Sequence, residues 1–457
     1  MKRLIDHFLL EWQQKKNHKP LLLRGARQVG KTHAVRVLGQ TFTNFIEINL
    51  ESNLAARKIL EQDLDLARIT LQLSELLQQP ITPGQTLLFF DEIQNVPQAI
   101  TALRYFYEQL PELHVIAAGS LLDFAIEQVG IPVGRVSTLY MYPLSFLEFA
   151  VATGHATWAK AILDYNPQYM SLPLHEKILA LLGTYLAIGG LPEAVNEWVH
   201  SQTSRAVKTV HSDLIYTYEQ DFGKYAKQHQ IKYLNLIFLR ATEQLANKFM
   251  FTKFGEYKKR ELAPALELLE KAGLLYKVMH SAAQGIPIGA QADPDKFKLI
   301  FLDVGLSQAL LKLDISSWLI DPTTNFINKG ELVEAFIGQE LLAYADPISK
   351  ESLFYWARET SSSSAEIDYV IQLQDQVVPV EVKSGTSHRI KSMQIFLETH
   401  PNSTQALRFW ANPGTPALDT PEATMSPLKS YPLYAVAHVL SAHQDYLRPA
   451  LEYLVAL

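Results

Sequence analysis

The chain contains no cysteine among its 457 residues, which excludes disulfide bonds and thiolate metal sites. It also lacks a long hydrophobic run, because its longest apolar stretch, 178–191, is interrupted by glycine and is too short to cross a bilayer. Charged residues interrupt the apolar run within residues 1–6, so this segment does not have the pattern of a signal peptide. We therefore expect a soluble, cytoplasmic protein without membrane contact.

Charged residues are few, at 19% of the chain, and the net charge of -6 argues against a wholly basic nucleic-acid coat. Hydrophobic residues make up 48%, which suits a globular protein. A chain of this length is too long for one hydrophobic core. We expect roughly two to four domains.

A glycine-rich segment follows the apolar run 21–23 and precedes a run of helix formers. It fits the P-loop pattern G-x-x-x-x-G-K-[ST], and its members are Gly25, Ala26, Arg27, Gln28, Val29, Gly30, Lys31 and Thr32. The glycines let backbone N–H groups point at phosphate oxygens, and the next helix adds its positive N-terminal end. We expect Lys31 to reach the β- and γ-phosphates of ATP and Thr32 to hold Mg²⁺. A chance match in a glycine-containing turn is the alternative.

A second motif, at residues 87–92, argues against a chance match. It is an apolar strand, of the kind buried in a parallel sheet, that ends in two carboxylates. We expect Asp91 to bind Mg²⁺ through water and Glu92 to orient the attacking water. The adjacent Asp-Glu pair favours an ATPase over a small GTPase.

Strands and helices alternate through the first third of the chain. This alternation predicts an α/β fold with a doubly wound parallel sheet over residues 1–142. The expected strands are the apolar runs at 21–23, 45–50, 87–91, 114–118 and 139–141.

Two polar residues of this region are candidate phosphate sensors. Ser120 follows the fourth expected strand, where a sensor of the γ-phosphate would lie, and its alternative role is the N-cap of a helix from Leu121. Arg135 follows Gly134 and could act as an arginine finger. The residues alone favour the alternative that Arg135 is a solvated loop arginine.

Residues 143–229 have a helical pattern, and we expect a helical lid there. Beyond them, helical segments precede a β-like pair at 274–279 and 297–302, which indicates a winged helix. Residues 230–312 carry twelve basic and eight acidic side chains, a net charge of +4. We expect contact with DNA phosphates here, whereas packing between domains is the alternative. The basic residues just before the expected recognition helix are Lys253, Lys258, Lys259 and Arg260.

The last region has its own polar residues. Glu381 and Lys383 alternate along an expected strand and so face the same side. Asp368 lies on the strand before, and Glu334 on an earlier helix. Carboxylates can share a Mg²⁺, and a lysine can stabilise phosphate charge or activate water. This arrangement indicates a restriction-type nuclease, with Glu334, Asp368 and Glu381 as metal ligands and Lys383 as a catalytic residue. Two half-exposed strands with solvated charges are the alternative.

Together the motifs resemble prokaryotic AAA+-like ATPases of the archaeal-ATPase group, which end in a restriction-endonuclease-like domain of unknown function. The resemblance rests on residues 25–32, 87–92, 118–120, 134–136, 142–149, 189–193, 301–306, 366–368 and 381–383. It implies an AAA+ core, a helical lid, a winged helix and a nuclease-like domain, and it raises Arg135 above the solvated-loop alternative. The implied domains cover residues 1–142, 143–229, 230–328 and 329–457.

Two functions fit these expectations. The first is an ATP-driven motor or switch on DNA with a Mg²⁺-dependent nuclease at its C-terminus. The second is a regulatory ATPase whose C-terminal domain is an inactive protein-interaction module. Residues 329–400 carry six basic and eleven acidic side chains, a net charge of -5, which favours the second, whereas the intact Asp368, Glu381 and Lys383 favour the first. A protein partner or a homo-oligomer is compatible with both.

Overall fold

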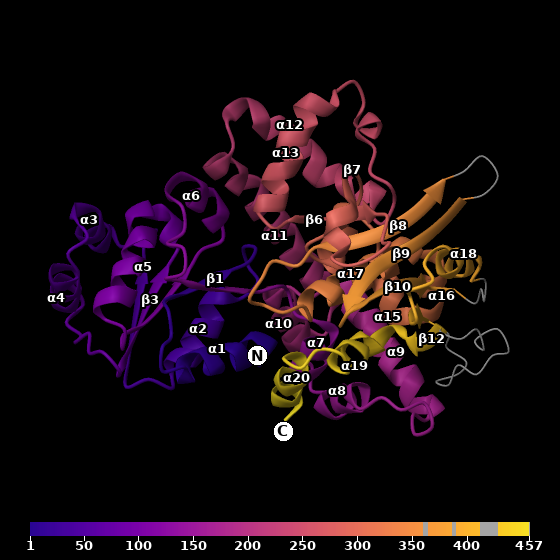
Figure 1. The fold of residues 1–457 in the computed structure, drawn as a ribbon, viewed down its shortest axis with the longest axis horizontal. Helices are drawn as coiled ribbons and strands as arrows, with labels where there is room; N and C mark the ends of the chain where they lie inside the picture. The colour runs from indigo at the N-terminus through magenta and orange to yellow at the C-terminus, as the bar shows by residue number, and fades with distance from the viewer. Residues whose placement is uncertain (360–363, 386–389, 412–427, 457) are drawn as a thin grey trace. The chain divides into compact units, whose positions relative to one another are not determined.

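The computed structural model describes residues 1–359, 364–385, 390–411 and 428–456 (Figure 1). The chain divides into two compact units. The N-terminal unit contains residues 1–142 with 271–273 and 346–350. The C-terminal unit contains residues 143–270, 274–345 and 351–457.

The N-terminal unit is built on a five-stranded sheet with the order β2-β3-β4-β1-β5. All four neighbouring pairs are parallel, which confirms the predicted parallel α/β core. The strands are β1 (Leu21–Arg24), β2 (Asn44–Asn49), β3 (Thr86–Asp91), β4 (His114–Ala118) and β5 (Ser137–Tyr140).

Helices cover both faces of this sheet. On one face Leu22, Phe90 and Phe106 belong to an apolar core formed with α3–α6. On the other face Gly39 of α2 lies against the ring of Phe45. The sheet strands are apolar on both sides for this reason, as β3 shows with every residue buried. The helices are α1 (Leu4–Gln14), α2 (Lys31–Gly39), α3 (Leu54–Gln62), α4 (Leu66–Leu77), α5 (Pro97–Gln109) and α6 (Leu122–Val129).

The C-terminal unit contains a seven-stranded mixed sheet with the order β12-β11-β10-β9-β8-β6-β7. The strands are β6 (Leu275–Ser281), β7 (Ala292–Phe301), β8 (Leu353–Glu359), β9 (Ser364–Leu373), β10 (Gln376–Lys383), β11 (Ala406–Trp410) and β12 (Leu428–Pro432).

The strand pair expected as a wing is present but is not separate. β6 and β7 pair antiparallel, with Leu275 opposite Phe301. β6 also pairs parallel with β8, with Val278 opposite Leu353. The backbone groups on the second edge of β6 are thus bonded within the sheet instead of being left to water. The expected boundary between 328 and 329 therefore falls inside one compact unit with a continuous sheet.

Helices make up most of residues 143–229, as expected. In the part of the chain that is described, no single helix is long and apolar enough to span a membrane, and α9 with α10 meets that test only as a pair bent by 120°. The helices of the C-terminal unit are α7 (Phe146–Ala152), α8 (Ala156–Leu163), α9 (Leu172–Ile188), α10 (Pro192–Ser201), α11 (Ser204–Tyr225), α12 (Gln228–Arg240), α13 (Lys259–Lys271), α14 (Val304–Leu310), α15 (Ser316–Ile320), α16 (Pro322–Asn328), α17 (Gly330–Ala343), α18 (Lys391–Thr399), α19 (Val436–Ser441) and α20 (Leu447–Val455).

Three of the sequence motifs outside the P-loop meet at one junction in the C-terminal unit. The Gly190 N–H donates to Asp303 Oδ2 at 2.6 Å, and the Gly190 carbonyl accepts from the Leu144 N–H at 2.7 Å. A Cβ on Gly189, whose φ is 81°, would lie 2.1 Å from Asp303 Oδ1. Packing between α7, α9 and α14 thus accounts for these motif residues without a catalytic role.

Candidate active site

The P-loop lies between β1 and α2, and three of its residues have positive φ values. Gly25, Gln28 and Gly30 have φ values of 145°, 68° and 99°. A Cβ on Gly25 would lie 2.2 Å from the Met141 carbonyl oxygen, so a larger residue does not fit. Gly30 is the N-cap of α2 and brings no side chain to it, which leaves the first-turn N–H groups oriented for an anion.

Lys31 is folded back over the loop that precedes it. Its Nζ donates to the Gly25 and Ala26 carbonyl oxygens at 2.9 and 2.7 Å. Burial lowers the pKa of Lys31 to about 8, against the opposing effect of Glu92 and Asp91. A bound phosphate chain would supply the negative charge that favours the ammonium form.

Thr32 and Asp91 meet at the C-terminal end of the sheet. The Thr32 hydroxyl donates to Asp91 Oδ2 at 3.1 Å. Burial raises the pKa of Asp91, and the neighbouring Glu92 carboxylate raises it further. A cation at this point would offset both effects. Hydroxyl and carboxylate oxygens are the ligands that Mg²⁺ prefers, so the residues present fit this ion.

Glu92 and Gln94 form a second polar pair beside Asp91. Glu92 has a φ of 52°, a left-handed conformation that is uncommon for a non-glycine residue. Its carboxylate accepts a hydrogen bond from the Gln94 side-chain amide. Sequence reasoning missed Gln94, although a polar residue so close to the Asp-Glu pair was an available signal.

Ser120 does not cap the helix that follows it. The N-cap of α6 is Leu121, without a side-chain hydrogen bond, so the structure does not support the alternative role of Ser120 as the N-cap of this helix. Among the described residues, the buried Ser120 hydroxyl has no hydrogen-bond partner. The adjacent Gly119 lies against Gln94, because a Cβ there would be 2.0 Å from Gln94 Oε1. The sensor role of Ser120 stays a prediction.

Arg135 lies far from the P-loop of its own chain. It precedes β5, whose first residue, Ser137, pairs with Leu21 at the start of β1, whereas the P-loop follows the other end of β1. Four strand residues separate these edges by roughly 13 Å. The Arg135 side chain is 47% exposed, and its Nε lies 3.3 Å from Glu108 Oε1. This placement argues against a role in cis and leaves a role in trans as a proposal.

Arg3 is a buried residue at the P-loop that sequence reasoning missed. Its Nη1 donates to the Val29 carbonyl at 2.9 Å, and its Nη2 donates to the Tyr142 carbonyl at 2.8 Å. Arg3 thus fixes the P-loop backbone to the segment after β5. No pattern in the sequence distinguishes it from any arginine before an amphipathic helix.

The predicted C-terminal residues do come together. Asp368 on β9 accepts a hydrogen bond from the Val382 N–H at 2.7 Å, and Lys383 pairs with Glu381 on β10. Burial raises the pKa of Glu381 to about 7, and the nearby Asp368 adds to this effect. Glu334 on α17 is close enough for Asp368 to raise its pKa beyond the effect of burial.

Lysines engage carboxylates of this cluster, and the metal site there stays a prediction. Within the described ranges, no group of three or more His, Asp or Glu side chains is arranged to hold a metal ion. The reason is visible in the ion pairs: Lys298 on β7 lies 2.8 Å from Glu334 Oε1 and 2.5 Å from Glu366 Oε1. Sequence reasoning missed both residues as site members. A lysine within the apolar run 297–301 was the available signal for Lys298.

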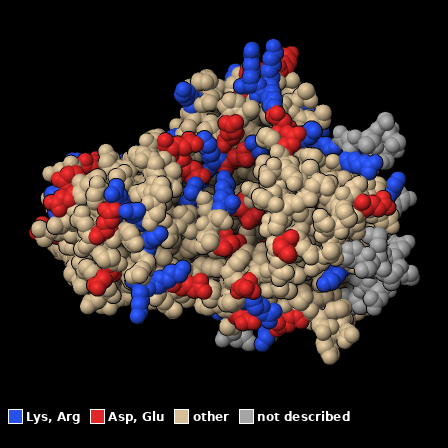
Figure 2. Space-filling model, in the orientation of Figure 1, with Lys and Arg blue, Asp and Glu red and all other residues tan. Residues whose placement is uncertain are grey.

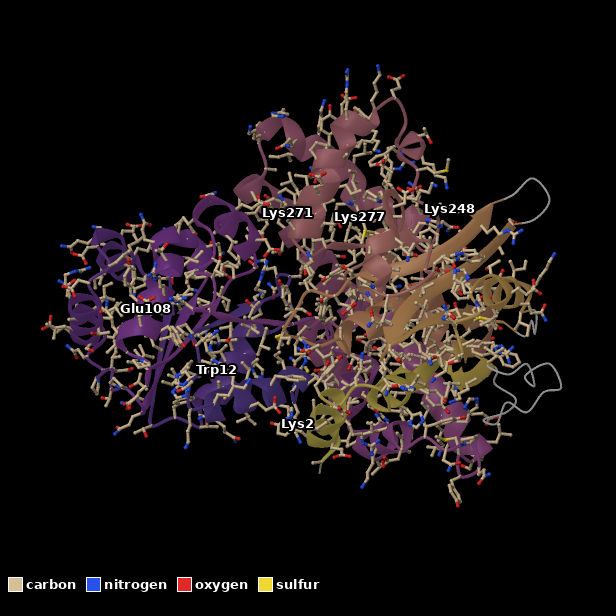
Figure 3. The ribbon with its side chains drawn as sticks, viewed as in Figure 1. Lys2, Trp12, Glu108, Lys248, Lys271 and Lys277 are labelled. Atoms are coloured by element: carbon tan, nitrogen blue, oxygen red, sulfur yellow. The ribbon has the colours of Figure 1, made fainter. Side chains whose placement is uncertain are left out.

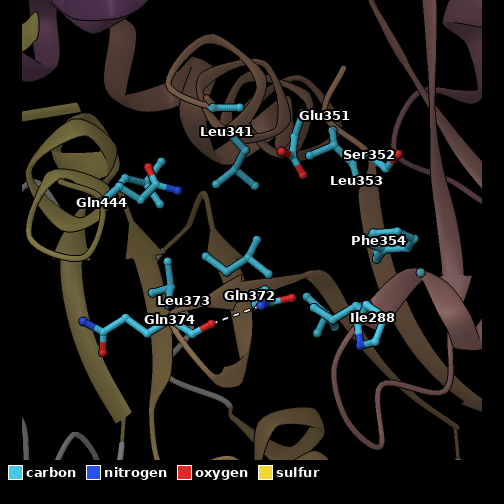
Figure 4. Close-up of a pocket in the computed structure, with 16 residues that line it drawn as sticks. Ile288, Leu341, Glu351, Ser352, Leu353, Phe354, Gln372, Leu373, Gln374 and Gln444 are labelled. Carbon is cyan, nitrogen blue, oxygen red and sulfur yellow. Dashed lines mark hydrogen bonds between the residues drawn. The ribbon is translucent and has the colours of Figure 1, made fainter. Parts of the chain in front are cut away.

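A pocket of ≈ 380 Å³ lies elsewhere in the C-terminal unit (Figure 4). Its lining is mostly apolar, with Leu341, Leu353 and Phe354, and its polar members include Gln372 and Gln444. None of the predicted site residues lines it.

Comparison with known families assigns the N-terminal region. Residues 17–150 match the model of an AAA domain. Residues 179–317 and 329–431 match two domains of unknown function, DUF8612 and DUF4143. No curated protein matches the chain. With the geometry of Lys31, Thr32 and Asp91, the match shows that the chain carries an AAA-type P-loop ATPase domain.

Solved structures resemble the chain only distantly. A Walker-type ATPase of Pyrococcus abyssi is 16% identical with a TM-score of 0.45, over 68% of this chain and 95% of the other. The Orc1 protein of Aeropyrum pernix, solved in complex with DNA, is 13% identical with a TM-score of 0.29, over 69% and 92%. PCH-2 of C. elegans is 13% identical with a TM-score of 0.28, over 45% and 67%. At these TM-scores the structural similarity supports no conclusion about this chain.

Proposed function

We propose that the chain is an ATP-dependent switch that binds ATP with Mg²⁺, hydrolyses it slowly and transmits its nucleotide state to a non-catalytic C-terminal unit. The observation that carries the ATPase part is the meeting of Thr32 and Asp91 at 3.1 Å beside the Lys31 ammonium. The AAA-domain match over residues 17–150 supports it.

In this proposal each residue of the P-loop region has a separate task. Lys31 leaves the Gly25 and Ala26 carbonyls and donates to the β- and γ-phosphates instead. Thr32 and Asp91 hold Mg²⁺, which when bound neutralises charge on the phosphate oxygens. Glu92 accepts the proton of the attacking water, and Gln94 positions the Glu92 carboxylate.

Calorimetry of ATP binding to Lys31→Ala tests the proposal. We expect binding to be abolished, because the phosphate chain loses its main side-chain partner. Lys58→Ala, which changes an exposed lysine of α3, is the matched control and should bind as the wild type does. An unchanged affinity in Lys31→Ala would sink the assignment of the nucleotide site.

DNA binding by the C-terminal unit is a second candidate function. A cleft of ≈ 390 Å³ is lined by Lys248, Lys296 and the rings of Phe249 and Tyr355, among others. Lys and Arg side chains also stand out around α12 and α13 in Figure 2, whereas Figure 3 labels Lys248 beside the strands of the sheet. The exposed basic residues there include Lys253, Lys258, Lys259 and Arg260.

We expect this surface to bind DNA with little sequence preference. Because phosphate contacts release counterions, affinity should fall steeply with salt, and Lys258→Ala with Arg260→Ala should reduce the slope by about two. Fluorescence anisotropy of a labelled oligonucleotide over a salt series measures this, with the exposed Lys312→Ala as control. Absence of binding at low salt would leave the basic residues as a solvated surface.

A further inference from the structure

Lys298 is a buried lysine in the middle of an apolar strand segment. Its residue exposure is 1%, and residues 297–301 of β7 are all buried. A buried ammonium group is costly unless it is paired and hydrogen-bonded. Lys298 meets this requirement through Glu334 on α17 and Glu366 on β9, and its Nζ also lies 5.2 Å from the Tyr355 ring centroid.

Two lysines and one backbone N–H engage the four surrounding carboxylates, whereas the buried Oε2 of Glu381 has no hydrogen-bond partner among the described residues. Glu334 and Glu366 pair with Lys298, and Glu381 pairs with Lys383. Asp368 accepts a hydrogen bond from the Val382 N–H at 2.7 Å.

We propose that Lys298 is the resident cation of this cluster and that it excludes divalent metal from the place where the sequence predicts a nuclease metal site. This inference rests on the proposed function, in which the C-terminal unit is non-catalytic. A Mg²⁺ or Mn²⁺ ion needs several oxygen ligands at close to 2 Å. The Lys298 ammonium already contacts one oxygen of Glu334 and one of Glu366, from strand β7.

The ion pairs of Lys298 connect segments that are far apart in the chain. Lys298 precedes α17 by a long stretch of chain, yet it joins β7 to both α17 and β9. The ion pairs of Lys298 therefore link the edge strand β7 to α17, the helix that packs on the sheet. Exchange of this lysine for a metal ion would break two ion pairs at once.

Electron paramagnetic resonance of Mn²⁺ titrated into the full-length protein, without nucleotide, tests the proposal. The Asp91→Asn background removes binding at the P-loop. On this background we expect no Mn²⁺ site in the otherwise unchanged protein, and one new site in Lys298→Met with at least about tenfold higher affinity than any background binding. Lys298→Arg keeps the cation and should behave as the unchanged protein does. Lys277→Met, on the neighbouring strand β6, is the matched control.

Two results would overturn the proposal. One is a Mn²⁺ site in the Asp91→Asn protein that Asp368→Asn abolishes. The other is equal Mn²⁺ binding with and without Lys298→Met. If Lys298→Met does not fold, the double variant Lys298→Met with Glu366→Gln, which removes both partners of the Lys298–Glu366 ion pair, takes its place. ATP binding, measured on Lys298→Met with Asp91 intact, reports on the nucleotide site separately.

Discussion

Arg3 shows how a residue outside the P-loop determines its conformation. The guanidinium donates to the Val29 and Tyr142 carbonyls from a nearly buried position. Because the fork is planar and rigid, it holds two backbone segments at a fixed separation. Both of these hydrogen bonds are to backbone carbonyls, so we interpret Arg3 as a positioning residue.

Arg3→Met should weaken ATP binding about tenfold, because it removes hydrogen bonds worth roughly 1–1.5 kcal/mol to the loop backbone. The turnover number at saturating ATP should change much less. Steady-state kinetics that separate KM from kcat measure this, and Arg3→Lys should restore only part of the affinity because it lacks the fork. Lys15→Met, at the exposed end of α1, is the control. An unchanged KM would show that the P-loop holds its conformation without Arg3.

The residues of the nucleotide site could be predicted because P-loop chemistry is local. Eight consecutive positions and one Asp-Glu pair define it. The structure places the Thr32 hydroxyl against Asp91, and the roles of these residues in nucleotide binding stay predictions. The C-terminal cluster could be predicted only in part. Asp368, Glu381 and Lys383 are near in sequence, but Lys298 reaches them from another strand through tertiary packing, which no local pattern reports.

Helices α9 and α11 are joined by a buried histidine. The last helical turn of α9 leaves the Ile188 carbonyl without an intrahelical partner, and His211 Nε2 donates to it at 2.9 Å. His211 is fully buried, and burial lowers its pKa to about 4. The histidine is therefore neutral in the folded protein.

This contact makes the stability of the C-terminal unit depend on pH. Since the folded pKa lies below the unfolded value of about 6.5, the contribution is complete above pH 6.5 and is lost as the pH falls toward 4. Near pH 5 the loss is about 2 kcal/mol. His211→Asn keeps a donor but does not titrate, so its melting temperature should fall less between pH 7.5 and about 5. The exposed His229→Asn should keep the wild-type dependence, and a dependence unchanged in His211→Asn would contradict the assignment.

The strand pair β6–β7 illustrates the limit of prediction for whole elements. Its residues and antiparallel pairing follow from local alternation, and the structure contains them. Its neighbour β8 lies more than fifty residues further along the chain, so local sequence could not show that β6 has a partner on both edges. The parallel sheet of the N-terminal unit was easier to predict, because strands buried on both faces are apolar throughout.

At the scale of the whole molecule, the prediction that Arg135 acts as an arginine finger requires a second copy of the chain, because this residue lies far from its own P-loop. Arg135 precedes β5 at the edge of the sheet opposite to the P-loop, and its side chain is half exposed. An arginine that stabilises the γ-phosphate in trans is supplied by a neighbouring subunit. A role of Arg135 in trans therefore predicts a homo-oligomer in the presence of ATP.

Arg135→Ala should lower turnover by roughly 10³-fold with little effect on ATP affinity. A complementation assay makes the test specific: Arg135→Ala and Glu92→Gln are each inactive alone, and mixing them should restore activity, because one chain supplies the arginine and the other an intact site. Arg104→Ala, which removes the other arginine paired with Glu108, is the control. No recovery on mixing, or wild-type turnover in Arg135→Ala, would favour the alternative that Arg135 is a solvated loop residue without a role in turnover.

The measurement that tests the central claim most directly is ATP binding and ATP turnover in Glu92→Gln, made on the same preparation of the full-length protein. The account predicts that calorimetry gives wild-type affinity, because Lys31, Thr32 and Asp91 are intact, while turnover falls by at least about 10²-fold, because no general base remains. Wild-type turnover in Glu92→Gln, or no ATP binding by the wild type itself, would contradict the assignment of this chain as an ATP-hydrolysing switch.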